Sequence, residues 1–177
     1  MRHADHVGLL APAVRLDEGG TWADLGAGSG AFTLALAELI GTHGVIHAID
    51  RDRAALAELR ASSVSAVPMA EIRTRVADFT ERLDLRDLEG VVMANSLHFV
   101  DDKLPVLARI RRYLKPRGRL LLVEYDSDRG NPWVPYPMSF ETWRRVAEDA
   151  GFTGTKEIAD VPSRFLGRMY SALSLVP

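Results

Sequence analysis

The feature that most constrains this chain is a glycine-rich segment between a short apolar run and a longer amphipathic one. Residues 21–25 predict a strand, and residues 31–40 predict a helix that ends at Gly41. Between them lies Asp24-Leu25-Gly26-Ala27-Gly28-Ser29-Gly30. Glycine permits backbone torsions that other residues resist, and it lets a ligand come close to the main chain. The amides at the start of the following helix favour a negatively charged group. The segment therefore predicts a ligand-binding turn.

The rest of the chain continues the alternation of apolar runs and amphipathic runs. Further helices are expected from Asp50, after Asp101 and Asp102, and over residues 139–150; further strands are expected over residues 45–49, 71–77, 90–94, 120–125, 155–161 and 165–175. Strands that alternate with helices favour a parallel sheet. The last two strands are joined around Pro162-Ser163 and form a terminal pair. We expect one α/β domain over residues 1–177, with a mostly parallel sheet and a C-terminal antiparallel strand pair.

Composition excludes some classes of function. The 22 basic and 24 acidic residues give a net charge of -2, which leaves no electrostatic footprint for nucleic acid or an anionic membrane. Cysteine is absent, which excludes disulfides, thiolate metal sites and a cysteine nucleophile. We expect no metal site. Neither a signal peptide nor an apolar run of about 18 residues is present, so we expect a cytoplasmic protein without a membrane segment.

The glycine segment taken alone is compatible with two ligands. Gly26, Gly28 and Ala31 satisfy the G-x-G-x-x-G/A pattern of dinucleotide-binding folds. Asp50 follows Gly30 by 20 residues, which is near the spacing of a ribose-binding acid. The other pattern in the segment is an acidic residue followed by G-x-G-x-G.

The order of the motifs that follow resembles the class I S-adenosylmethionine-dependent methyltransferases. Asp24 to Gly30 matches the first motif of that family position by position. The second, third and fourth motifs of the family are matched by residues 45–50, 76–79 and 90–97. Residues 114–120 resemble the L-K-P-x-G-x-L turn that leads into the fifth strand of that family. The resemblance runs from about Trp22 to Tyr125 and implies a Rossmann-like three-layer sandwich.

The resemblance also implies which residues bind S-adenosylmethionine. Asp50 would accept hydrogen bonds from both ribose hydroxyls, Asp78 would meet the adenine amino group, and Phe79 would line the ring. The full set implied is Asp24, Gly26, Ala27, Gly28, Ser29, Gly30, Asp50, Arg51, Asp78, Phe79, Asn95 and Ser96. The alternative is that Asp50 and Asp78 cap helices and that Asp24 forms a turn.

The acceptor end of the site is expected just after the fourth strand. His98 is a candidate general base, because imidazole suits proton transfer near neutral pH; the alternative is a histidine that packs at the rim. Residues 95–99 do not resemble the N-P-P-Y or D-P-P-Y pattern of enzymes that methylate base amines, which favours a small-molecule acceptor. Glu124 and Tyr125 are further candidates. So are four aromatic residues near the proline-rich stretch, which could equally pack in the core: Trp133, Tyr136, Phe140 and Trp143.

Two other functions stay open from the sequence. A nicotinamide-dinucleotide oxidoreductase would lack a substrate domain here, and a non-catalytic S-adenosylmethionine-binding module would keep the fold without turnover. Only about twenty residues precede the first motif, whereas many family members carry a longer helical segment over the cofactor. We therefore expect an open site, or one closed by a loop or by the second subunit of a homodimer.

Overall fold

The computed structural model describes residues 1–64 and 69–177, and over these residues it forms a seven-stranded sheet in the order β3-β2-β1-β4-β5-β7-β6. The strands are β1 Gly20–Leu25, β2 Gly44–Asp50, β3 Glu71–Val76, β4 Leu88–Ala94, β5 Leu114–Tyr125, β6 Thr153–Ser163 and β7 Gly167–Leu175. Strands β1 to β5 are parallel, and β7 runs antiparallel to both β5 and β6. This confirms the predicted sheet and its terminal antiparallel pair. The strand order reverses between β1 and β4, and ligands of open α/β sheets bind at such a switch point.

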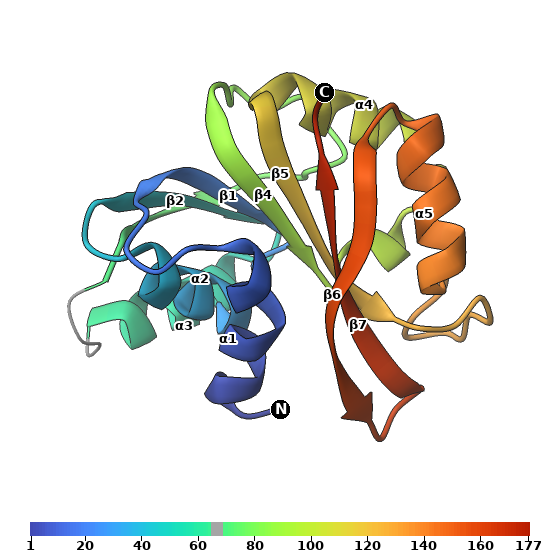
Figure 1. Cartoon of the computed structure of the whole chain (residues 1–177). Helices are drawn as coiled ribbons and strands as arrows, with labels where there is room; N and C mark the ends of the chain where they lie inside the picture. The colour runs from blue at the N-terminus through green and yellow to red at the C-terminus, as the bar shows by residue number, and fades with distance from the viewer. Residues whose placement is uncertain (65–68) are drawn as a thin grey trace.

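Helices cover both faces of the sheet (Figure 1). One face carries α1 His3–Leu10, α2 Ala31–Ile40 and α3 Arg53–Val64, and the other carries α4 Leu104–Tyr113 and α5 Phe140–Asp149. There are also two short 3-10 helices in the described ranges, η1 Ala11–Ala13 and η2 Leu97–Phe99. Successive strand side chains point to opposite faces, so Trp22 packs with α1 and α2 while its neighbour Ala23 packs with α4 and α5. Among the helices in the described ranges, none is long and apolar enough to span a membrane.

Two of the differences from the predicted boundaries involve proline residues. Strand β5 begins at Leu114 and contains the Lys115–Gly118 turn that was expected to precede the strand. The sheet absorbs that turn as a bulge, because the register against β4 jumps from Leu114 to Arg119 and Arg117 adopts a positive φ of 62°. Pro162 lies inside β6 rather than in the connection. Proline is tolerated there because β6 is an edge strand.

Candidate functional site

The three glycines of the Gly26–Gly30 turn have different physical roles. All three have positive φ, at 84°, 53° and 95° in chain order. A Cβ atom on Gly26 would lie 2.4 Å from Cβ of Ser96, and one on Gly30 would lie 2.2 Å from Cδ1 of Leu59. A Cβ on Gly28 would meet nothing within 4 Å among the described residues. Close packing therefore requires Gly26 and Gly30, while Gly28 leaves open space for a ligand.

A first cavity of about 350 Å³ lies at the carboxyl ends of β1 to β4. Of the predicted cofactor residues it is lined by Gly26, Gly28, Asp50, Arg51, Asp78, Phe79, Asn95 and Ser96. Four lining residues were not predicted: Ala77, Thr80, Phe99 and Val100. Ala77 and Thr80 flank the predicted Asp78 and Phe79, while Phe99 and Val100 lie at and just after the end of η2.

The two acids of the first cavity are held by local hydrogen bonds. Asp50 accepts from the backbone N–H groups of Gly28 and Asp52, each at 2.8 Å. Asp52, not Asp50, caps the first amides of α3. Asp78 accepts from the N–H and the hydroxyl of Thr80, at 2.8 and 2.7 Å, and these bonds lower its pKa. Both carboxylates are thus oriented at the rim of one cavity, where a ribose and an adenine amino group could donate to them.

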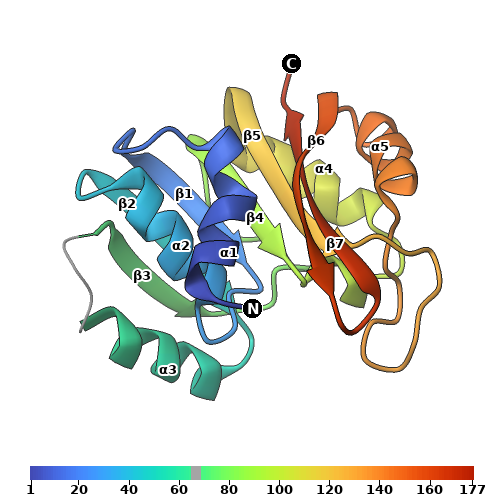
Figure 2. The same ribbon diagram turned by 60° about the horizontal axis from the view of Figure 1, so that its bottom comes forward.

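A second cavity of about 250 Å³ lies between the glycine turn and α1. It is lined by the remaining predicted residues, Asp24, Ala27, Ser29 and Gly30, and it shares Gly26, Gly28 and Asn95 with the first cavity. Figure 2 shows α1 beside α2 at this end of the sheet. From α1, His6 lines the cavity with its ring against Phe32, the centroids 4.8 Å apart. The segment before the glycine turn therefore helps to close the site, which the sequence did not indicate.

Asp24 is a buried carboxylate in this second cavity. It is 1% exposed and accepts a hydrogen bond from the hydroxyl of Thr33 at 2.6 Å. Burial raises the pKa of Asp24 to about 7, with a smaller push from the negative charge of Asp50 and against the bond from Thr33. A carboxylate in this environment is stabilised in its charged form by a nearby cation. The position therefore favours the positively charged part of a ligand.

A third cavity, of about 400 Å³, is called the aromatic cavity below. It is lined by Asn95, His98, Tyr125, Trp133, Val134 and Phe165. Asn95 lines all three cavities. It directly follows β4 with a φ of 52°, a left-handed conformation that asparagine tolerates better than most residues. The end of β4 therefore joins the first and second cavities to the aromatic cavity.

His98 and Glu124 form a buried pair at one wall of the aromatic cavity. His98 is 3% exposed and Glu124 0%, and Nδ1 of His98 lies 3.0 Å from both carboxylate oxygens. The backbone N–H of Tyr125 also donates to Glu124, at 2.7 Å. A carboxylate only accepts, so the proton of a neutral His98 lies on Nδ1, and Nε2 is the nitrogen that can accept another. The sequence indicated both residues but not their pairing, which follows from β4 and β5 being parallel neighbours.

The aromatic residues of the proline-rich stretch divide between cavity and core. Trp133 lines the aromatic cavity. Trp143 is fully buried, and Phe140 packs edge-on against Tyr170 with centroids 5.7 Å apart, so core packing is the correct interpretation for these two. Tyr136 lines a separate groove, and its backbone N–H donates to the carbonyl of His98 at 3.0 Å. Phe165, from the turn between β6 and β7, was missed because a lone exposed aromatic residue in a turn carries no spacing signal.

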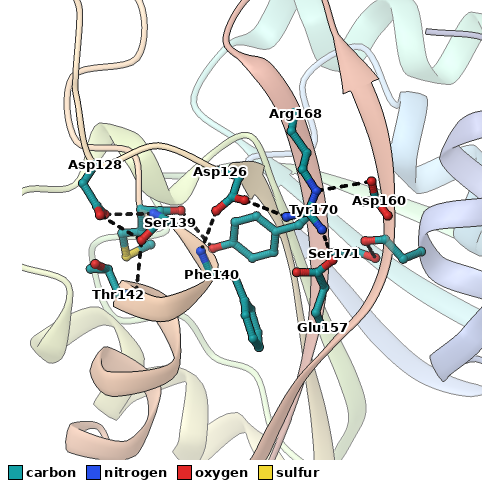
Figure 3. Close-up of polar contacts among 12 residues, drawn as sticks. Asp126, Asp128, Ser139, Phe140, Thr142, Glu157, Asp160, Arg168, Tyr170 and Ser171 are labelled. Carbon is teal, nitrogen blue, oxygen red and sulfur yellow. Dashed lines mark hydrogen bonds and ion pairs between the residues drawn. The ribbon is translucent and has the colours of Figure 1, made fainter.

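Figure 3 shows an ionic cluster around Arg168 that includes Asp126, the residue directly after Tyr125 of the aromatic cavity. Arg168 of β7 donates to Asp126 at 2.6 Å and to Asp160 at 3.3 Å, and it also pairs with Glu157. Asp126 follows Tyr125 at the end of β5 and accepts from the backbone N–H of Phe140 at 2.9 Å. These bonds connect the β6–β7 hairpin, the end of β5 and the start of α5. The segments that supply Tyr125, Trp133 and Phe165 are thus joined at their bases.

Comparisons with known proteins bear on the family and the fold of this chain. A methyltransferase domain family matches residues 23–120, whereas a search of curated proteins finds no match. The fold is similar to the YcgJ protein of Bacillus subtilis, with 13% identity, a TM-score of 0.76, and 98% of this chain and 99% of that chain covered. It is also similar to an S-adenosylmethionine-dependent methyltransferase from Aquifex aeolicus, with 18% identity, a TM-score of 0.71 and full coverage of both chains.

A third similar structure is an arsenic(III) S-adenosylmethionine methyltransferase from Chlamydomonas reinhardtii. It has 21% identity and a TM-score of 0.69, with 90% of this chain and 65% of that chain covered. At these identities the structures show a shared fold, and the family match covers more than half of the chain. The chain therefore belongs to the methyltransferase domain family, with the Rossmann-like fold and the S-adenosylmethionine cofactor of its class I members.

Proposed function

We propose that this protein transfers the methyl group of S-adenosylmethionine to a small molecule bound in the aromatic cavity, and that His98 removes a proton from that acceptor. The observation that carries the proposal is the position of Asn95, which lines the first cavity, the second cavity and the aromatic cavity. A methyl donor on one side of Asn95 would therefore lie next to an acceptor on the other.

The described residues suit this cofactor. The open space at Gly28 would let the cofactor approach the main chain of the glycine turn. Asp50 would hold the ribose, and Asp78 would hold the adenine amino group. Asp24 would face a cation, which the methionine part provides as an ammonium group. When bound, S-adenosylmethionine supplies a methyl group on a positively charged sulfur, which is already activated for transfer.

The chain's own contribution is alignment and proton removal. Alignment of reacting groups supplies much of the rate of such a transfer. His98 adds a base whose orientation is fixed, because Glu124 holds Nδ1 through both carboxylate oxygens at 3.0 Å. A positioned base contributes about 10²–10⁴-fold to a rate. Burial of the pair keeps water away from the carboxylate, so the imidazole ring stays in one orientation.

The test is His98→Ala with rescue by added imidazole. Turnover, measured as release of the demethylated cofactor with an accepted substrate, should fall by about 10²–10⁴-fold. Cofactor affinity by titration calorimetry should stay near the wild-type value, because the base acts on the acceptor. Imidazole should restore part of the rate by entering the space that the side chain leaves.

The matched control is His43→Ala. His43 is exposed and immediately precedes β2, at the amino end of the strands and away from the site. It should leave turnover unchanged. Near wild-type turnover in His98→Ala, or a loss that imidazole does not relieve, would contradict a base at this position and leave alignment as the whole contribution.

Calorimetric titration with S-adenosylmethionine, its demethylated product and NAD separates the alternatives. The dinucleotide oxidoreductase would bind NAD, and a non-catalytic module would bind the methyl donor without turnover. Arsenic methylation of the thiol-dependent kind is disfavoured, because the sequence has no cysteine. A one-domain organisation, a cytoplasmic location and a homodimer stay predictions from the sequence.

A further inference from the structure

The walls of the aromatic cavity indicate the charge of its ligand. Five of its lining residues are Asn95, Tyr125, Trp133, Val134 and Phe165, none of which is charged at neutral pH. The sixth is His98, whose partner Glu124 is 0% exposed and so has no surface in the cavity. A charged molecule would gain no charged partner among the described lining residues, so any hydration that it loses on binding would not be offset. The cavity therefore favours an uncharged ligand.

Its aromatic side chains indicate the shape of the ligand. Trp133 is 72% exposed and Phe165 is 49% exposed, although both line a cavity. The ring centroid of Tyr125 lies 5.7 Å from that of Phe165 and 6.2 Å from that of His98. Aromatic pairs prefer offset or edge-on contacts at about 4.5–7 Å. A flat ring in this cavity could contact these exposed faces and bury them.

Hydrogen bonds connect the segments that carry the three aromatic walls. Tyr125 ends β5, Trp133 lies in the loop before α5, and Phe165 lies in the β6–β7 turn. Asp126 next to Tyr125 bonds to both Arg168 at the base of the hairpin and the first amide of α5. Asp128 accepts from the N–H and hydroxyl of Ser139 at 2.9 and 2.8 Å, which anchors the far end of the loop (Figure 3). Walls whose segments are connected in this way favour a ligand of matching shape.

His98 indicates which group the ligand carries. Its Nδ1 is held by Glu124, so the hydrogen bond that it offers to the cavity is an acceptor at Nε2. The matching group on an uncharged ring is a hydroxyl, because its proton can pass to Nε2 and leave an oxygen that attacks a methyl group.

We propose that the acceptor is an uncharged planar aromatic molecule with a hydroxyl group, and that the hydroxyl oxygen is methylated. In that reaction the hydroxyl proton passes to Nε2 of His98. The O–CH3 bond forms as the S–CH3 bond breaks, and the electron pair of the broken bond stays on the sulfur. His98 then releases its proton to solvent. This inference rests on the proposed function.

The experiment uses naphthol as the probe, with naphthoic acid, naphthalene and naphthylamine as matched compounds. Each is titrated into the protein saturated with demethylated cofactor, and each is separately incubated with S-adenosylmethionine for mass spectrometry of products. Naphthol should bind more tightly than the other three and yield a methyl ether. Phe165→Ala should weaken naphthol binding by roughly 2- to 12-fold, as expected for one aromatic pair.

The control is Leu16→Ala, which truncates an exposed apolar side chain between η1 and β1 and should leave naphthol binding unchanged. Naphthoic acid binding as tightly as naphthol would overturn the uncharged class. Methylation of naphthylamine in preference to naphthol would overturn the hydroxyl. If the cofactor binds but naphthol does not, the acceptor class is wrong while the proposed function stands; if the cofactor itself does not bind, the proposed function fails.

Discussion

Replacing Asp24 with asparagine should change how the stability of the protein depends on pH. The side chain is 1% exposed, and burial raises its pKa from 3.8 to about 7. The folded protein therefore keeps the proton up to about pH 7, whereas the unfolded chain releases it near pH 4. Because the folded state binds more protons in this window, its stability falls as pH rises from about 4 to about 7. Asparagine cannot ionise, so the variant lacks this loss.

The size of the effect follows from the pKa difference. A shift of about 3 units at about 1.36 kcal/mol per unit is about 4 kcal/mol at pH values above 7. This is a large fraction of a typical unfolding free energy of about 5–15 kcal/mol. The Thr33 hydroxyl, which donates at 2.6 Å in the wild type, can still donate to the amide oxygen of asparagine. The substitution thus removes the charge with little change in shape.

The cofactor should reverse the sign of this effect. An ammonium group beside Asp24 favours the ionised carboxylate, so binding to the wild type should release a proton below about pH 7 and strengthen as pH rises to that value. Asp24→Asn should bind more weakly above pH 7 and without this proton release. Denaturant unfolding between about pH 5 and pH 8, and calorimetry in buffers of different ionisation enthalpy, measure both quantities. Parallel stability curves for the two proteins, or binding without proton release, would refute the reasoning.

Two further substitutions test the cofactor acids and the cavity walls. Asp50→Ala should weaken cofactor binding by about 1.5–3 kcal/mol, measured by calorimetry. The control is Asp52→Ala, which removes the α3 cap and should cost about 1 kcal/mol of stability with unchanged cofactor affinity. Equal losses of affinity in the two variants would show that Asp50 has only a structural role. Arg168→Met should weaken naphthol binding several-fold with unchanged cofactor affinity, because it removes the hydrogen bond between the β6–β7 hairpin and Asp126. The control is Arg144→Met, which removes an exposed ion pair with Glu141 on α5 and should leave naphthol binding unchanged. Unchanged naphthol binding in Arg168→Met would show that the ionic cluster does not position the walls of the aromatic cavity.

The parts of the fold that the sequence predicted are those with local signals. The helix over residues 31–40 was placed correctly, because its apolar spacing and Gly41 lie within one window of sequence. The β5 boundary was wrong because a proline and a glycine normally end an element, and only the pairing with β4 shows that a bulge absorbs them. In the same way, His98 and Glu124 are 26 residues apart. Their pairing depends on which strands are neighbours, which no local pattern encodes.

The family pattern and the structure divide the site into two halves. The family match ends at residue 120, and the residues predicted to bind the cofactor all precede that point. Glu124, Tyr125, Trp133 and Phe165 lie beyond it, on β5, the loop before α5 and the β6–β7 turn. Cofactor binding needs the same groups in any member that uses the same cofactor, so those residues carry a recognisable pattern. The walls of the proposed acceptor site need only suit one acceptor, so they carry no shared motif, and they come together only when the chain folds.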